Sequence, residues 1–457
     1  MMDPNPALEY AAARQDQSLD ELKQLLRIPS ISTLPENKPD MQRAAKWLAA
    51  RMKKAGLTSV EVMPTDGHPV VYAERMQAGS DKPTVLVYGH YDVQPVDPLD
   101  LWISDPFEPE VRGEDLFARG ASDMKGQVMA SLWAAEAWLK TSALPLNIKF
   151  LIEGEEEIGS PNLRPFLEAH GELLACDLCL NCDSGILSAD IPSIVYGLRG
   201  LAYFEIRMQG PAGDLHSGTF GGAVPNPANI LCRLIAGMHD SEGRVTLPGF
   251  YDSVRPLAAE ERQQLSQLPY DDVWWMKTSG APALSGEAGY SATERASARP
   301  TLDVNGLLSG FTGAGSKTVL PSKAMAKISM RLVPDQQPEQ VAEALRAFLR
   351  EQAPPTVSWE VIDWASAVPS ILERDSEAVK AAIRAQETVW GRAPMFSRQG
   401  GTVPVVGMIE EALGVKTLMM GFGLPDDNLH APNEKFHVPN YRRGIQAYIR
   451  FLSEYAG

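Results

Sequence analysis

An apolar run passes directly into polar residues in Pro83-Thr84-Val85-Leu86-Val87-Tyr88-Gly89-His90-Tyr91-Asp92-Val93. Residues 84–88 are β-branched or apolar and lie between a proline and a glycine, which predicts a short buried strand. His90 and Asp92 follow the C-terminal end of this strand, where open α/β sheets place their functional side chains. A histidine there can bind a metal through one ring nitrogen while a carboxylate fixes the other nitrogen.

The order of helix and strand patterns predicts an α/β fold with an inserted domain. Residues 1–195 alternate between the two patterns, which favours a largely parallel sheet with helices on both faces. In residues 196–366 the predicted strands have one face exposed to solvent, and the order of elements is β-α-β-β-α-β, which is typical of a ferredoxin-like layer. A segment rich in Pro, Gly and Ser at 243–298 is expected to be an insertion in that layer. The α/β pattern returns over residues 367–457.

Composition excludes several classes of protein. At 457 residues, with 44% hydrophobic and 22% charged residues, the chain is expected to be globular with at least two domains. The net charge of −16 argues against partners such as nucleic acid or an anionic membrane surface. There is no apolar run of about 18 residues and no secretory signal, so a cytoplasmic location is expected.

Two motifs are expected to be misleading. Cys176, Cys179 and Cys182 have a spacing found in metal clusters, but they fall on a predicted strand and are interpreted as small buried thiols. The Gly-rich segment 310–318 resembles a phosphate-binding loop but lacks the required Gly-Lys pair between a strand and a helix.

Polar side chains follow five predicted strands, and these ends are expected to meet at one edge of the sheet. They supply His90 and Asp92; Asp123 after 115–122; Glu153–Glu157 after 147–152; Asp183 after 177–181; and Asp426, Asp427 and His430 after 416–420. So many carboxylates in one crevice need a counter-charge, and these loops hold no comparable set of Lys or Arg. Divalent cations would supply that charge; mixed His and carboxylate ligands suit zinc, with manganese as the alternative. The residue set favours a two-metal site with one further carboxylate as general base, and the pair Glu156–Glu157 suits that division.

These motifs are similar to those of the M20 metallopeptidases. The resemblance rests on His90-x-Asp92, Gly120-Ala121-Ser122-Asp123-Met124-Lys125-Gly126, Glu153-Gly154-Glu155-Glu156-Glu157-Ile158-Gly159-Ser160 and Asp183. Within the family, Asp214-Leu215-His216-Ser217-Gly218 and His430-Ala431-Pro432-Asn433-Glu434 most resemble the branch of cytosolic non-specific dipeptidases and carnosinases. The resemblance covers nearly the whole chain in matching order.

The resemblance implies a role for each polar residue of the metal site. One metal ion would be bound by His90 and Asp183, the other by Glu157 and His430, and Asp123 would bridge the two. Asp92 would orient His90, and Glu156 would act as general base and acid. The Asp123–Met124 peptide is implied to be cis.

The resemblance also implies roles for the inserted domain. Residues 196–366 would form a lid and dimerisation domain of a homodimer, with residues 1–195 and 367–457 as the catalytic domain. His216 would reach the active site of the other subunit and stabilise a tetrahedral oxyanion. Thr318, Arg331 and Thr402 would bind substrate, with the guanidinium of Arg331 holding a carboxylate through two hydrogen bonds.

The expected activity is hydrolysis of dipeptides or similar small peptides with a free C-terminal carboxylate, by a metal-bridging water that Glu156 activates. The alternative within the family is another amidohydrolase, such as a glutamate carboxypeptidase, or an aminoacylase or deacetylase that acts on N-acyl amino acids. A non-catalytic binding protein is the alternative from another class. Loss of Glu156 or of a metal ligand would indicate it, and none is missing.

Overall fold

The computed structural model describes residues 2–457 and contains two compact units. The first unit comprises the chain up to Tyr196 together with Leu372–Ser397 and Met408–Gly457. The second comprises Gly197–Ile371 and Arg398–Gly407. Residues 367–457 were expected to belong to the first unit, but residues 367–371 and the segment Arg398–Gly407 lie in the second.

A mixed sheet carries most strands of the first unit. Its order is β1 (Thr58–Met63), β2 (Val70–Arg75), β6 (Asn147–Glu153), β3 (Thr84–His90), β7 (Leu178–Asn181), β17 (Thr417–Met419), β8 (Ser193–Leu198) and β15 (Ser370–Ile371), and β16 (Met395–Gln399) pairs with β8. The central strands β6, β3, β7 and β17 are parallel, as the alternation of helices and strands predicted. The outer pairs, such as β1 with β2, are antiparallel, because the connection between these two strands is too short for a crossover helix.

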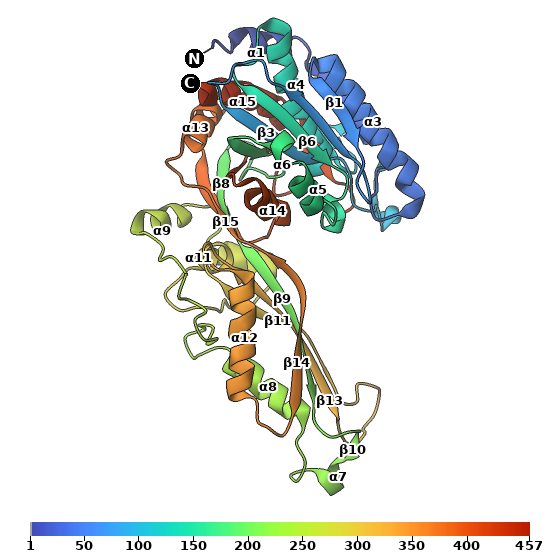
Figure 1. Ribbon diagram of the computed structural model, residues 1–457, viewed down its shortest axis with the longest axis vertical. Helices are drawn as coiled ribbons and strands as arrows, with labels where there is room; N and C mark the ends of the chain where they lie inside the picture. The colour runs from blue at the N-terminus through green and yellow to red at the C-terminus, as the bar shows by residue number, and fades with distance from the viewer. Residues whose placement is uncertain (1) are drawn as a thin grey trace. The chain divides into compact units, whose positions relative to one another are not determined.

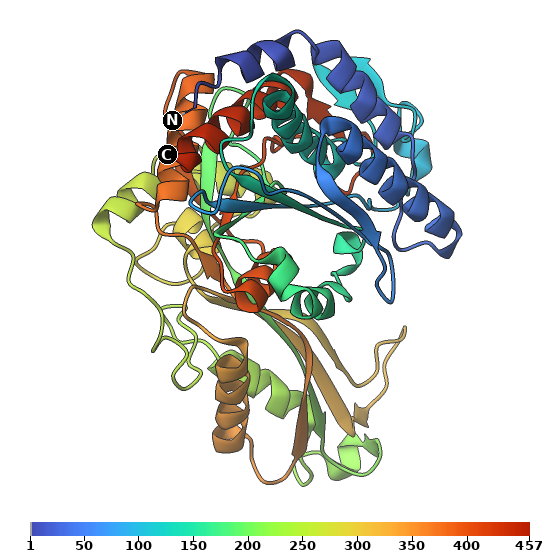
Figure 2. The same ribbon diagram turned by 45° about the horizontal axis from the view of Figure 1, so that its top comes forward.

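Helices cover both faces of this sheet, as predicted. Figures 1 and 2 show α4 and α15 on one face and α5 and α6 on the other. The helices of this part of the chain are α1 (Asn5–Ala12), α2 (Gln15–Leu26), α3 (Lys38–Ala55), α4 (Gly126–Thr141), α5 (Leu163–Ala169), α6 (Gly171–Leu174), α13 (Glu377–Trp390), α14 (Pro404–Leu413) and α15 (Val438–Ala456), with short helical turns η1 (Pro35–Asn37), η2 (Leu99–Leu101), η3 (Ala121–Lys125) and η4 (Glu156–Ile158). Gly56 ends α3 in the left-handed conformation at φ 110°, where a glycine carries no steric penalty.

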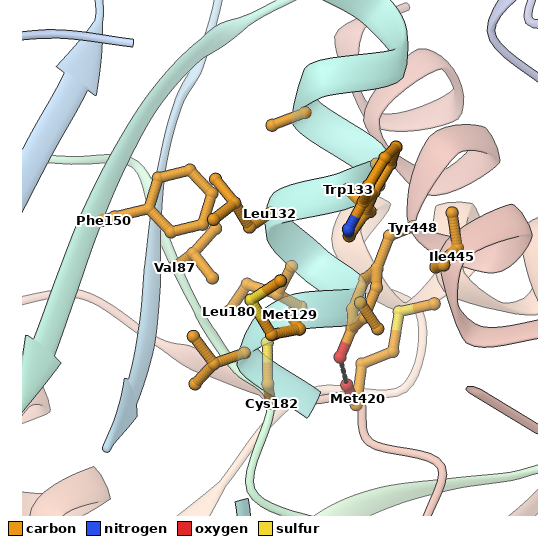
Figure 3. Packing of buried hydrophobic residues seen from close by; sticks show 14 of the residues in the cluster. Val87, Met129, Leu132, Trp133, Phe150, Leu180, Cys182, Met420, Ile445 and Tyr448 are labelled. Atoms are coloured by element: carbon orange, nitrogen blue, oxygen red, sulfur yellow. Dashed lines mark hydrogen bonds between the residues drawn. The ribbon is translucent and has the colours of Figure 1, made fainter. Parts of the chain in front are cut away.

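The core of the first unit is built around α4. Figure 3 shows Leu132 and Trp133 of this helix among side chains from the sheet and from α15, with the Tyr448 hydroxyl donating to the Met420 carbonyl. Cys182 belongs to the same core, where burial raises the pKa of its thiol to about 12. Cys179 is also fully buried, whereas Cys176 is only partly buried, so the interpretation as small buried thiols holds for two of the three residues.

Asp123 is not delivered by a strand of the main sheet, and that part of the sequence analysis was wrong. β5 (Asp115–Phe117) is only three residues long and lies in a separate antiparallel sheet with β4 (Glu110–Arg112) and β18 (Lys435–His437). The chain then turns through Gly120 at φ 82°, and Asp123 lies in η3, just before α4.

The second unit has the predicted ferredoxin-like layer. Its sheet has the order β11 (Thr301–Ser309), β13 (Lys323–Leu332), β9 (Gly200–Gln209) and β14 (Ser358–Ala367), with every neighbouring pair antiparallel. The helices α8 (Pro227–Gly237) and α12 (Pro338–Gln352) lie on one face of this sheet (Figure 1). Their buried side chains form one hydrophobic cluster with those of the sheet. The remaining elements are β10 (Leu215–His216), α7 (Ser217–Phe220) and β12 (Val319–Leu320), and the insertion holds α9 (Ala259–Leu265), α10 (Asp272–Ser279) and α11 (Ala292–Ser297).

Across residues 2–457, no helix combines the length and the apolar character that a membrane crossing requires.

Candidate metal centre

His90 is the last residue of β3 and is completely buried. Its Nδ1 lies 3.1 Å from the Asp92 carbonyl oxygen and 3.3 Å from Asp92 Oδ1. Its Nε2 lies 3.2 Å from Asp123 Oδ1 but makes no hydrogen bond to any residue in 2–457. A histidine held through Nδ1 leaves the lone pair of Nε2 for a metal, so this orphaned nitrogen fits a metal ligand.

Asp92 connects His90 to the loop after β6. Its side chain is completely buried, and its two oxygens accept hydrogen bonds from the backbone N–H groups of Glu156 (3.3 Å) and Glu157 (3.1 Å). One carboxylate therefore sets the orientation of the imidazole and the position of two neighbouring glutamates.

Asp123 lies between the two histidines. Asp123 Oδ1 faces His90, and Asp123 Oδ2 lies 2.8 Å from His430 Nε2, which is also 3.1 Å from Glu157 Oε2. His90, Asp123 and Glu157 each offer one ligand atom, and these atoms lie within 4.8 Å of one another. The Asp123–Met124 peptide is cis, as the sequence resemblance implied. The contacts of Asp123 with both histidines fit a carboxylate that is shared between two ions.

Asp183 and Glu156 lie close enough to these residues for the charges to shift one another's pKa. Asp183 follows β7, and its backbone N–H donates to Asn181 Oδ1 at 2.7 Å. Burial, followed by the charge of Asp123, raises the pKa of Asp183 to about 7. Burial, together with the charges of Asp183 and Glu157, raises the pKa of Glu156 to about 8.

No Lys or Arg within residues 2–457 forms an ion pair with Asp123, Glu156, Glu157 or Asp183. Carboxylates crowded in this way need a cationic neighbour to stay ionised. Carboxylate oxygens with neutral imidazole nitrogens are a donor set that zinc accepts. The residues present therefore fit a site for divalent metal ions.

Glu434 fixes the turn that carries Asp123. This fully buried carboxylate accepts hydrogen bonds from the backbone N–H groups of Gly120 (2.9 Å), Ser122 (3.0 Å) and Asp123 (3.1 Å), and from Arg119 Nη1 (2.7 Å). Glu434 belongs to the motif His430-Ala431-Pro432-Asn433-Glu434, but no role was predicted for it. Its position four residues after His430 was the one available signal.

The predicted substrate-binding residues form two pairs in the second unit. His216 is exposed at the end of β10, and the next residue donates its N–H to the Thr318 carbonyl at 3.0 Å. Arg331 Nη1 donates to Thr402 Oγ1 at 2.8 Å. His216 and Thr318 lie near Lys323 at one end of β13, and Arg331 with Thr402 lies at the other end. At the usual rise per residue of a strand, the two ends are roughly 26 Å apart.

Comparison with known proteins agrees with this arrangement. Peptidase family M20/M25/M40 matches over residues 86–454. Among curated proteins, the chain is 32% identical to the Cys-Gly metallodipeptidase DUG1 of Candida albicans, covering 98% of this chain and 97% of that protein. It is 33% identical to the human Beta-Ala-His dipeptidase, covering 99% and 94%.

A solved structure is also similar over nearly its whole length. The M20 family metallo-carboxypeptidase Sso-CP2 from Sulfolobus solfataricus superposes with a TM-score of 0.82 at 35% identity, covering 96% of this chain and 99% of that one. The predicted fold class is confirmed by this likeness.

Proposed function

We infer that this chain, which belongs to peptidase family M20/M25/M40, is a metallodipeptidase that hydrolyses dipeptides or similar small peptides with a free C-terminal carboxylate. Its curated relatives named above are a Cys-Gly metallodipeptidase and a Beta-Ala-His dipeptidase, similar along their full lengths. The observation that carries the proposal is the cluster of His90, Asp123, Glu157 and His430, whose nitrogen and oxygen atoms lie within hydrogen-bonding distances, with His430 on its exposed side.

The proposal assigns the metal ligands as the sequence resemblance implied. His90 and Asp183 would hold one ion, Glu157 and His430 the other, and Asp123 both. Zinc is favoured because the set mixes imidazole and carboxylate donors, and manganese is the alternative. When bound, the two ions polarise the scissile carbonyl and lower the pKa of a water molecule.

Glu156 is proposed to move the proton. Its backbone N–H is held by Asp92, so the side chain has a fixed origin beside the cluster. The surrounding carboxylates and burial raise the pKa of Glu156, which suits a group that takes a proton from water and returns it to the leaving amine. Arg331, held by Thr402, would bind the substrate carboxylate with its planar pair of donors.

We propose that the active enzyme is a homodimer. The separation of His216 and Thr318 from Arg331 and Thr402 supports this, because one substrate cannot touch both ends of the sheet in one chain. The sheet of the second unit also exposes large apolar side chains, including Leu307, Leu308 and Trp364. His216 would then donate a hydrogen bond to the oxyanion that forms in the other subunit's site.

A cytoplasmic location remains part of the proposal. Within residues 2–457 all four cysteines are free thiols, which fits a reducing compartment.

The central test is the change of Glu156 to Gln. We expect turnover of a dipeptide to fall roughly 10²–10⁴-fold, because the amide cannot accept the proton. Elemental analysis should show that the variant keeps its metal. The exposed Glu172, changed to Gln, serves as the control and should leave turnover unchanged. A Glu156 variant with near-normal kcat would contradict the assignment.

A second assay separates the dipeptidase from the other amidohydrolases of the family. The wild-type enzyme should hydrolyse dipeptides at least tenfold faster than N-acyl amino acids at equal concentrations, measured as kcat/KM. A preference for N-acyl amino acids would identify an aminoacylase or deacetylase instead.

A further inference from the structure

The second unit contains a cavity of about 740 Å³ between the insertion and one end of the sheet. This volume lies in the range of small-molecule sites. Its charged wall consists of Arg199, Arg295, Arg299, Arg331, Glu287 and Asp303. Positive groups therefore outnumber acidic ones here, in a chain whose net charge is −16.

Arg199 is buried in this wall without a counter-charge. Only 8% of the residue is exposed, and it forms no ion pair with any residue in 2–457. Its Nε donates to the Gly400 carbonyl at 3.0 Å, and its Nη1 lies 3.3 Å from the carbonyls of Arg295 and Arg299. These carbonyls fix the plane of the guanidinium but do not neutralise it. Burial, and then the charge of Arg331, lowers the pKa of Arg199 to about 10.

Two further arginines of the wall also lack an acidic partner. Arg331 donates to the Thr402 hydroxyl, and Arg295 donates to the carbonyls of Tyr290 (2.8 Å) and Ser285 (2.9 Å). Neither forms an ion pair within the described residues, 2–457. The wall thus presents three guanidinium groups that only neutral acceptors hold.

In contrast to these three arginines, Arg299 in the same cavity is neutralised by an ion pair. It makes two hydrogen bonds of 2.7 Å to the Glu287 carboxylate, and both side chains are buried. Asp303, the other acidic residue of the wall, is exposed and accepts a hydrogen bond from Thr301. Asp303 forms no ion pair with Arg199, and its charge only partly offsets the effects of burial and of Arg331 on the pKa of Arg199.

We propose that this cavity selects substrates whose C-terminal residue has an acidic side chain. The inference rests on the proposed function, in which Arg331 holds the α-carboxylate of a small peptide. Arg199 and Arg295 then receive the side-chain carboxylate. In both arginines Nε and Nη1 donate to backbone carbonyls, which leaves Nη2 to donate to a carboxylate oxygen. The positive charge strengthens such a hydrogen bond, and burial strengthens the attraction. The insertion at 243–298 supplies Arg295 and thereby gains a role in specificity.

The test compares substrates of equal shape and different charge. The metal-loaded wild-type enzyme is assayed with Ala-Glu against Ala-Gln, and with Ala-Asp against Ala-Asn. We expect kcat/KM to be at least tenfold higher for the acidic member of the better pair. Equal values within threefold for both pairs would overturn the inference and leave the dipeptidase intact. Failure to hydrolyse all four peptides would instead overturn the proposed function.

Substitutions locate the preference. Arg199→Gln should reduce the ratio of kcat/KM for the acidic substrate to kcat/KM for its amide counterpart towards one. Arg199→Lys should keep part of the ratio, because the charge remains. Arg346, which pairs with Asp363 outside the cavity, serves as the control, and Arg346→Gln should leave the ratio unchanged. An unchanged ratio in a folded Arg199→Gln enzyme would overturn the assignment. If that variant does not fold, Arg295→Gln decides in the same way.

Discussion

At the scale of single residues, buried carboxylates with fixed partners shape the metal centre. The Asp92 carboxylate contacts Nδ1 of His90 and accepts a hydrogen bond from the backbone N–H of Glu156. The place of Asp92 beside His90 could be predicted from the sequence, because both residues follow directly after the strand at 84–88. Glu434 could not be predicted in the same way, since its contacts depend on how the turn at 120–123 folds.

Glu434→Gln should weaken metal binding although it changes none of the proposed metal ligands. The amide presents an NH₂ group where two backbone N–H donors need an acceptor, so the turn that carries Asp123 must shift. We expect a loss of metal affinity of roughly 10–100-fold, the size seen for residues that support metal ligands. Competition with a chelating dye measures the affinity, and the visible spectrum of the cobalt-substituted enzyme reports the altered ligand geometry.

The exposed Glu114, changed to Gln, is the control for Glu434. An unchanged metal affinity and cobalt spectrum in a folded Glu434→Gln enzyme would show that Glu434 has no positioning role.

At the scale of elements, the local sequence predicts that α4 is a helix but not that all of its faces are buried. The sequence predicted a helix from Gly126 with one apolar stripe, and the helix is there. The structure buries nearly every residue from Gly126 to Trp138, because α1 and α15 cover faces that the stripe leaves open. Those covering helices come from opposite ends of the chain, so no local window could reveal them.

Leu132→Ala tests this packing. Leu132 is fully buried, so its truncation leaves a cavity and should lower the free energy of unfolding of the first unit by about 2–5 kcal/mol. Urea unfolding followed by circular dichroism measures the change. Ile103→Ala, at a side chain that is 78% exposed, should change it by less than about 0.5 kcal/mol. Equal effects of both variants would contradict the view of α4 as the centre of the core.

At the scale of the whole molecule, the division into units was predicted from a change in strand character. Near Gly197 the strands change from buried parallel ones to antiparallel ones with one solvent-exposed face. This change is visible in the sequence, because apolar and polar residues alternate along strands of the second kind. The segment Arg398–Gly407 groups with the second unit although the strand pattern gave no sign of this, because its place depends on contacts such as that of Arg199 with Gly400. Contacts of this kind leave no periodic signal in the sequence.

The dimer proposal predicts complementation between two inactive chains. His216→Ala and Glu156→Gln enzymes should each be nearly inactive alone. A heterodimer of the two should regain one working site, because the intact Glu156 of one chain would meet the intact His216 of the other. The assay is dipeptide hydrolysis by heterodimers purified with two different affinity tags. If both residues act within one chain, the heterodimer stays inactive.

The first unit is assembled from segments on either side of the second, and this has a consequence for biosynthesis. A nascent polypeptide that has left the ribosome as far as Ile371 already contains His90 and Asp123, but His430, Glu434 and the helix α15 have not yet been made. Domains fold as units once their sequence is available. The complete set of proposed metal ligands therefore exists only after the residues that follow the second unit have been made, so a shorter nascent chain lacks the proposed site.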